Sequence, residues 1–285
     1  MAYAAGQGRR GGFRLLPLLL FGGYFVWYWF SNQSEVPMTG RTQLVDISRE
    51  QEEALGLEAY REVLGSERVV TTGELPGQVR ETAKRLIEAV HKLDPKADPG
   101  FTWEANVIES DQANAFALPG GKIAVYTGIL PIVANADGLA AVMGHEIAHA
   151  IARHRAERMA YQKLIQMGSM AAGMSIGEMD IGTQRMVMAA LGAGANFGVL
   201  LPFSRDHESE ADKLGLMFAA AACFDPREAP RLWERMGEAS KAQPPEFAST
   251  HPSHGTRIRL LNEWMPEAMK LREQYCGALP PEKPM

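Results

Sequence analysis

The pentapeptide HEIAH at residues 145–149 constrains this chain more than any other feature. Apolar residues recur at helical spacing over about 136–166, which predicts one long helix that carries the motif. Residues four apart share a helix face, so His145 and His149 can present two imidazoles to one metal ion, while Glu146 projects toward an adjoining water. We therefore expect a fold that brings a further ligand to this face.

The run SRDHESEAD at residues 204–212 supplies that ligand on a second predicted helix. Glu208 and Asp212 lie four apart on one face, and zinc binds two imidazole nitrogens and a carboxylate while leaving a position for water. We expect Glu208 to be the third ligand of one Zn²⁺ per chain and Asp212 to accept the free N–H of a zinc-bound histidine. Glu146 would take the proton of the attacking water. The alternative is a charged helix face whose carboxylates pair with neighbouring basic residues.

Three further polar residues near these motifs receive different predictions. His251 lies in a loop before a helix, where it would stabilise an oxyanion, occupy the open zinc position, or be an ordinary solvated histidine. The sequence alone does not decide which of these roles His251 has. His154 follows His149 by five positions and is predicted to turn off the metal face as a surface or packing residue. Glu210 is two positions from Glu208 and is predicted to point to the opposite side, which makes it the weaker ligand.

The N-terminus carries three arginines before an apolar run at residues 15–30 that ends in Trp, Tyr, Trp and Phe. As a helix over residues 13–30 this segment spans about 27 Å, close to the hydrocarbon thickness of a bilayer. The basic flank predicts that the chain after the span lies outside the cytoplasm. A cleaved signal peptide is the rival interpretation, but no A-x-A cleavage site follows the run, so we favour an uncleaved transmembrane anchor.

Shifts in composition divide the chain into five predicted parts. They are a cytoplasmic N-terminus at 1–12, the anchor at 13–30, a polar linker at 31–45, the main domain at 46–276 and a tail at 277–285. With 46% hydrophobic residues, the main domain has enough apolar material for one sizeable core.

Local patterns predict a fold of class α+β that is mainly helical. Helices are expected at 49–65, where Ser48 and Gln51 can form a capping box, and at 79–93. The alternating segments FTWEANVIES and ANAFALPGGKIAVYTGIL predict a small antiparallel sheet beside the HEIAH helix. The rest of the main domain is predicted to be helical.

Three features leave alternatives open. Residues 167–201 are rich in Met, Gly and Ala. They form either a second membrane-embedded segment or a helical, mobile part of the main domain near the active site. We favour the second alternative because glycines and Asn196 interrupt the apolar run. The strand within 113–126 is an edge that accepts a peptide through backbone hydrogen bonds, or one covered by a loop. Cys223 and Cys276 lack metal-ligand spacing and either form a disulfide or stay unpaired.

Four segments, NAFALPGG, HEIAHAIARH, SRDHESEAD and STHPSHGTRI, resemble in this order the motifs of metallopeptidase family 48. The resemblance covers most of residues 50–265. It implies a zincin-type fold with Glu146 as the catalytic base and three zinc ligands, His145, His149 and Glu208. In one branch of the family the histidine that matches His251 can approach the metal as an inhibiting fourth ligand. The single anchor is similar to the Oma-type and LoiP-like branch, although this chain lacks a lipobox cysteine, so lipid anchoring is not expected.

Together these features predict a membrane-anchored zinc endopeptidase of the gluzincin type, which hydrolyses peptide bonds of misfolded or membrane-associated proteins in protein quality control. We expect the catalytic domain to lie outside the cytoplasm, at a bacterial inner membrane facing the periplasm. The alternative is an autoinhibited or chaperone-like envelope assembly factor with a largely closed zinc site. A net charge of -5 argues against a nucleic-acid partner. The expected partners are unfolded proteins and the membrane, and no motif specifies the substrate or the oligomeric state.

Overall fold

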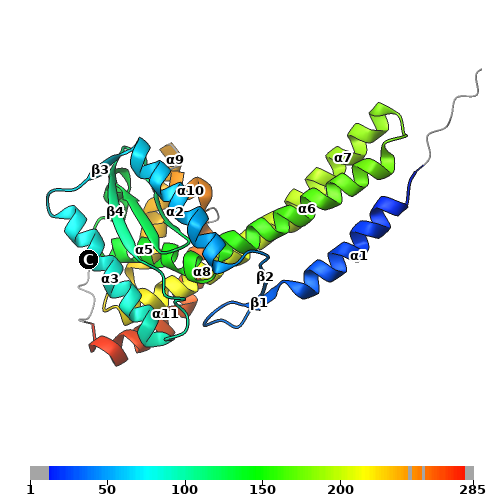
Figure 1. Cartoon of the computed structure of the whole chain (residues 1–285). Coiled ribbons are helices and arrows are strands. Elements are labelled where there is room, and N and C mark those ends of the chain that lie inside the picture. Colours follow the sequence, from blue (N-terminus) through cyan, green and yellow to red (C-terminus); the bar gives the residue numbers. More distant parts are fainter. Residues whose placement is uncertain (1–12, 243–245, 252–253, 280–285) are drawn as a thin grey trace, which may run out of the picture. The chain divides into compact units, whose positions relative to one another are not determined.

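The computed structural model describes residues 13–242, 246–251 and 254–279, and Figure 1 labels most of its helices and strands. Contacts divide this chain into two compact units. The first, called the mixed unit below, holds described residues of 35–41, 47–155 and 205–279; the second, the helical unit, holds 13–34, 42–46 and 156–204. The cytoplasmic segment predicted at 1–12 and most of the predicted tail lie outside the described residues.

Two predicted helices open the mixed unit. Helix α2, Arg49–Ser66, begins with the predicted capping box: the Gln51 backbone N–H donates to the Ser48 hydroxyl, and the Ser48 backbone N–H donates to the Gln51 side chain. Helix α3, Leu75–Leu93, starts four residues before the predicted position because Pro76 fits its first turn. Its apolar stripe is buried in the core.

A four-stranded sheet follows, in the spatial order β3 (Arg68–Val70), β4 (Glu104–Glu109), β6 (Lys122–Tyr126) and β5 (Ala115–Leu118). Strands β5 and β6 form a hairpin, and its turn contains two glycines with positive φ, 81° at Gly120 and 79° at Gly121. At Gly121 a Cβ atom would also lie 2.9 Å from the indole of Trp103. The turn therefore depends on glycine for both conformation and space.

The sheet is mixed, so the prediction of a purely antiparallel sheet was wrong. Strand β4 pairs in parallel with β6, from Glu104 opposite Lys122 to Ile108 opposite Tyr126. After β4 the chain crosses to the edge of the sheet, where β5 runs opposite to β4. The hairpin turn then brings β6 back between β5 and β4, so β4 and β6 run in the same direction. This order leaves β5 at one edge of the sheet.

Helix α5, Ala136–Ile151, carries the HEIAH motif and packs against β5 and α3. Nearly all of its residues from Gly138 on are buried, and it is covered by α8 (Leu201–Ala221) and α9 (Glu228–Ala242) in a core that also takes in α11 (His254–Cys276). Helices α5 and α8 cross at two glycines: a Cβ atom on Gly215 would lie 2.7 Å from the backbone nitrogen of His145. The close crossing brings the two predicted motifs together.

The long helix predicted over 136–166 is broken. Helix α5 ends at Ile151, Arg153 has a φ of 58°, and a new helix, α6 (His154–Ile176), begins at the next residue. The Arg153 side chain forms an ion pair with Glu52 and donates to the carbonyl of Ile47 at 3.0 Å. These contacts with α2 and the segment before it hold the left-handed conformation, which a local pattern cannot reveal.

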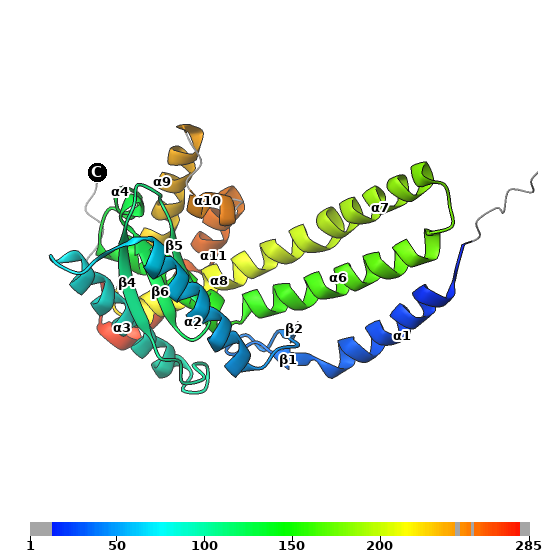
Figure 2. The same cartoon turned by 45° about the horizontal axis from the view of Figure 1, so that its top comes forward.

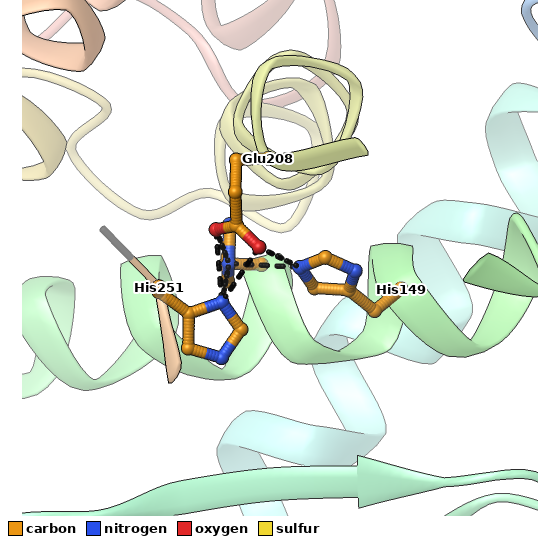
Figure 3. A group of neighbouring side chains, drawn as sticks. His149, Glu208 and His251 are labelled. Carbon is orange, nitrogen blue, oxygen red and sulfur yellow. Dashed lines mark hydrogen bonds and ion pairs between the residues drawn. The ribbon is translucent and has the colours of Figure 1, made fainter. Parts of the chain in front are cut away.

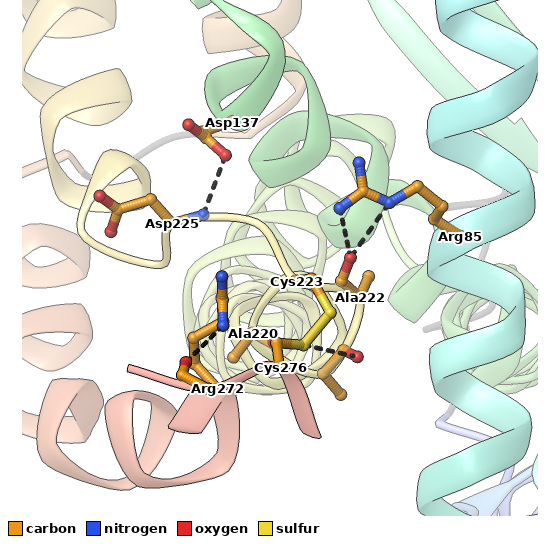
Figure 4. Close-up of a disulfide and its surroundings, with 10 residues drawn as sticks. Arg85, Asp137, Ala220, Ala222, Cys223, Asp225, Arg272 and Cys276 are labelled. Atoms are coloured by element: carbon orange, nitrogen blue, oxygen red, sulfur yellow. Dashed lines mark hydrogen bonds between the residues drawn. A yellow bond between two sulfur atoms is a disulfide. The ribbon is translucent and has the colours of Figure 1, made fainter. Parts of the chain in front are cut away.

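Cys223 and Cys276 form a disulfide that joins the end of α8 to the end of α11 (Figure 4). Nearby, the Asp225 backbone N–H donates to the Asp137 carboxylate at 2.9 Å, and the Arg85 guanidinium donates to the carbonyl of Ala222 at 2.6 Å. The alternative of two unpaired thiols is excluded.

The helical unit contains α1 (Leu16–Ser31), most of α6 and α7 (Ile181–Ala195), followed by a π-helical turn, Asn196–Leu200. A short ribbon of β1 (Gln33–Glu35) and β2 (Thr42–Leu44) follows α1. In the described part of the chain, no single helix combines the length and apolar character of a membrane span. A pair, Thr127–Val133 with Ala136–Ile151, meets the test together but is bent by 117°. The transmembrane role of residues 13–30 is therefore not confirmed.

The Met-rich segment 167–201 is helical, as predicted, but it groups with α1 and not with the unit that holds HEIAH. This grouping does not test whether the segment lies near the active site, which stays a prediction. Figure 2 shows α6 and α7 as an antiparallel hairpin.

Candidate metal centre

Four side chains from three segments of the chain converge inside the mixed unit. Figure 3 labels three of them, His149, Glu208 and His251. His145 and His149 come from α5, Glu208 comes from α8, and His251 follows the short helix α10 (Glu246–Thr250). One nitrogen or oxygen atom of each lies within 4.8 Å of the others. The Nε2 atoms of the α5 histidines are 3.1 Å apart, and His251 Nδ1 lies 2.8 Å from the Glu208 carboxylate. Two imidazoles and a carboxylate are a donor set that suits zinc.

Burial and charge set different protonation states for the groups of this cluster. Burial lowers the pKa of His149 well below 6.5, so this imidazole is neutral. Burial alone would raise the pKa of Glu208, but His149 and the hydrogen bonds from the surrounding histidines hold it far below its usual value. Burial and Arg257 oppose protonation of His145, yet Asp212 and Glu208 raise its pKa to about 9. A metal ion must therefore displace a proton from His145.

Asp212 lies where the sequence places it, beside His145. Its Oδ1 atom is 3.1 Å from His145 Nδ1, which leaves Nε2 of that ring directed at the cluster. A hydrogen bond at Nδ1 fixes the orientation of the ring.

Arg257, which the sequence reasoning missed, is a buried cation at this site with 2% exposure. Its guanidinium pairs with Asp212, lies 3.0 Å from the Glu208 carboxylate, and stacks on the Trp233 ring with the guanidinium carbon 3.5 Å from the centroid. The signal lay in the segment STHPSHGTRI, which contains both His251 and this arginine. Arg257 compensates the two buried carboxylates.

Glu146 lies between the cluster and the edge strand β5. The Ala117 backbone N–H donates to Glu146 Oε2 at 3.3 Å, and His251 Nε2 is 3.2 Å from Glu146 Oε1. This N–H belongs to the side of β5 that faces away from β6, because it reaches Glu146 and not the neighbouring strand. A peptide aligned along β5 would therefore pass the Glu146 carboxylate.

The edge of β5 is partly covered near its start. The Phe247 backbone N–H, at the start of α10, donates to the carbonyl of Ala113, two residues before the strand. Among the described residues β5 itself pairs only with β6. The alternative of a covered edge thus holds in part, because α10 caps the approach. The binding of a peptide along the rest of this edge stays a prediction.

His154 lies outside the four-residue metal cluster and is a buried packing residue, in line with the prediction, which missed its contact with His149. The ring is 3% exposed, and its Nδ1 atom lies 2.8 Å from Nδ1 of His149. Its Nε2 atom is 2.9 Å from the Glu210 carboxylate, and burial lowers the pKa of His154 to about 4. The contact was missed because a continuous helix was assumed, whereas the left-handed Arg153 rotates His154 back under His149.

Glu210 does not join the four-residue cluster. It accepts from Thr39 at 2.5 Å and from Arg41 at 2.9 Å, besides its contact with His154. Burial would raise the pKa of Glu210, but these partners lower it to about 2. A buried chain of contacts therefore runs from Glu210 through His154 to His149.

The chain is similar to known peptidases. Residues 75–265 match the model of peptidase family M48. The mitochondrial metalloendopeptidase OMA1 of Schizosaccharomyces pombe is 41% identical over 253 residues, which cover 86% of this chain and 70% of that protein. The mitochondrial metalloendopeptidase OMA1 of Homo sapiens is 34% identical over 281 residues, 94% of this chain and 52% of that protein. A β-barrel assembly-enhancing protease of Escherichia coli is 27% identical over 228 residues, 78% of this chain and 45% of that protein.

Proposed function

This chain belongs to peptidase family M48 and is a zinc metalloendopeptidase, and on that premise we propose that it is membrane-anchored and cleaves misfolded or membrane-associated proteins in protein quality control. The observation that carries the proposal is the position of Glu146, whose carboxylate lies between the cluster and the edge of β5. A base, a metal-ligand set and a backbone edge that can hold a peptide thus meet at one place.

We assign zinc binding to His145, His149 and Glu208. The bound ion would lower the pKa of a water molecule to about 7 and polarise the scissile carbonyl. Glu146 takes the proton from the attacking water and passes it to the leaving amine. Asp212 and His154 orient the two histidine rings from behind.

The edge of β5 supports a substrate class. A peptide that adds to a strand is held through its backbone, so the side chains contribute little to selection. Only an extended segment can bind in this way, which favours unfolded or loosened proteins. The Escherichia coli relative is named a β-barrel assembly-enhancing protease, which is in keeping with a role in protein assembly or quality control.

His251 makes the resting site a closed one in this proposal. Its Nδ1 atom lies 3.2 Å from His145 Nε2 and 2.8 Å from Glu208, inside the cluster of possible ligand atoms. The ring would leave this position when substrate arrives, and its Nε2 atom, now near Glu146, could then face the carbonyl oxyanion. The same observation favours the second candidate function, a chaperone-like envelope assembly factor whose zinc site stays closed.

Membrane anchoring is proposed through residues 13–30, with the catalytic unit outside the cytoplasm. The disulfide between Cys223 and Cys276 supports a location outside the cytoplasm, because such bonds persist in oxidising compartments. We propose a bacterial inner membrane facing the periplasm; the OMA1 relatives are named as mitochondrial, so the matching alternative is a mitochondrial membrane.

Two substitutions test the activity. Glu146→Gln should retain about one zinc per chain and lose cleavage of casein, an unfolded protein; full cleavage by this variant would refute the role of Glu146. His251→Ala should cleave casein faster than the wild type if the resting site is closed. No cleavage by either the wild type or His251→Ala would favour the assembly factor.

A further inference from the structure

The helical unit exposes most of the large apolar side chains in the described chain. Among the described residues, every exposed large hydrophobic side chain except Leu55 and Tyr275 belongs to this unit. On the α6–α7 hairpin, Met170, Met174 and Met186 are 61%, 58% and 69% exposed. Helix α7 buries none of its residues, although most of them are apolar. A helix that is apolar on its exposed sides is typical of a hydrocarbon environment and not of water.

Charged residues are confined to the ends of this unit. Residues 15–34, 164–177 and 186–204 contain no Asp, Glu, Lys or Arg. At the tip of the hairpin, Arg14 pairs with Glu178, and its backbone N–H donates to the carbonyl of Ser175 at 2.9 Å. Such a band of uncharged helix between paired charges matches the polarity profile of a bilayer.

Aromatic and charged groups mark the opposite end of the same band. The rings of Trp29 and Tyr161 contact edge to face, with centroids 6.2 Å apart. Lys163 forms an ion pair with Asp46, and its ammonium lies 5.4 Å from the centroid of the Tyr28 ring. Tyr and Trp beside a lysine are the residues that gather at a membrane interface. Because Arg14 contacts the C-terminal end of α6 and Trp29 contacts Tyr161 in its first half, α1 runs antiparallel to α6 with the two uncharged stretches side by side.

A groove of about 620 Å³ lies among the three helices. Its lining includes Leu18 and Phe25 of α1, Leu164 and Ala172 of α6, and Gly194 of α7, and no charged residue contributes to it. Only Trp29, Tyr161 and Ser169 bring polar side-chain atoms. The groove therefore offers an occupant almost nothing but hydrocarbon contact.

We propose that the α6–α7 hairpin enters the hydrocarbon layer of the membrane together with α1, and that acyl chains of membrane lipids fill the groove among them. The inference rests on the proposed membrane anchor and extends it from one helix to three. At 1.5 Å per residue the uncharged stretch 164–177 is about 21 Å long, against about 30 Å for a hydrocarbon core. Local thinning of the bilayer accommodates a mismatch of this kind.

Single cysteines labelled with an environment-sensitive NBD fluorophore test this in the full-length protein, reconstituted into phosphatidylcholine vesicles. The native thiols are joined in the disulfide, so the introduced cysteine is the reactive one. Met174→Cys and Met186→Cys probe the outer face of the hairpin, and Ala172→Cys probes the groove. Leu20→Cys on α1 reports the anchor, and Leu55→Cys on α2 is a matched exposed apolar control.

We expect bromine-labelled acyl chains to remove most of the fluorescence at positions 172, 174 and 186, as at position 20, with little quenching by aqueous iodide. Position 55 should show the reverse. Quenching at 174 and 186 by iodide, with position 20 quenched by lipid, would overturn the inference and leave the anchor standing. Lack of lipid quenching at position 20 as well would overturn both.

Protection of positions 174 and 186 from both quenchers would mean that protein covers the hairpin, for example a second copy of the chain, and would also overturn the inference. Lipid quenching at 174 and 186 without quenching at 172 would refute the occupied groove.

Discussion

The crossing of α5 and α8 at Gly215 predicts that one added methyl group will weaken both the fold and the metal site. A Cβ atom on Gly215 lies 2.7 Å from His145 N and 2.8 Å from the carbonyl carbon of Gly144. Nonbonded carbon atoms need about 3.5 Å, so the helices must separate by roughly 0.7 Å. Overpacking of this kind costs about 1–3 kcal/mol, which exceeds the roughly 0.5–1 kcal/mol that alanine gains over glycine within a helix.

The same separation affects the ligands, because Glu208 lies on α8 and His145 lies on α5 at the crossing itself. Their facing atoms, His145 Nε2 and Glu208 Oε2, are 3.4 Å apart. We therefore expect Gly215→Ala to lower the affinity for zinc as well as the free energy of unfolding.

Urea unfolding with and without a chelator, together with zinc competition, measures both effects in detergent. Gly237→Ala on α9 is the matched control, since nothing lies within 4 Å of a Cβ atom there. The free energy of unfolding of this control should rise by about 0.5–1 kcal/mol, and its zinc affinity should equal that of the wild type. If Gly215→Ala were as stable as Gly237→Ala and held zinc equally well, the reasoning about the helix crossing would be refuted.

Four further predictions follow from the contacts of the mixed unit. Asp212→Asn should weaken zinc binding about 10–100-fold in a competition assay; unchanged affinity would remove its orienting role. His154→Ala should also weaken zinc binding, and a normal affinity would show that its contact with His149 is only packing. The pKa of Glu210 is lowered to about 2 in the folded state, so its stabilising effect is complete above its unfolded pKa and is lost as the pH falls from about 4.5 to 2. The stability difference between wild type and Glu210→Gln should shrink over that range, and a constant difference would contradict the assignment. The Cys223–Cys276 disulfide closes a loop with a sequence separation of 53, so reducing it should lower the free energy of unfolding by about 4 kcal/mol through loop entropy. Urea unfolding with and without reductant measures this, and equal unfolding midpoints would refute it.

The site residues could be predicted because their geometry is mostly local. Two ligands four apart on one helix share a face whatever surrounds them, and the same holds for Glu208 and Asp212 on α8. The capping box at Ser48 is likewise a local contact, and it was found as predicted. What the spacing cannot supply is the crossing that joins the two helices, which depends on glycines far apart in the sequence.

The predictions that failed depend on tertiary contacts. The left-handed conformation of Arg153 is held by Glu52 and the carbonyl of Ile47, so the break that brings His154 under His149 had no local signal. The parallel pairing of β4 with β6 is set by strand order, which alternation of apolar residues does not encode. Arg257 lies in the segment STHPSHGTRI, but its burial between Asp212 and Trp233 could only be seen in the fold.

A crystal structure of the zinc-bound protein, with anomalous diffraction collected at the zinc edge, tests the central claim most directly. One ion should be held by His145, His149 and Glu208, with His251 as the fourth ligand in the absence of substrate. A zinc ion bound at His154 and Glu210 instead, or none bound at the predicted cluster after saturation with the metal, would contradict the account.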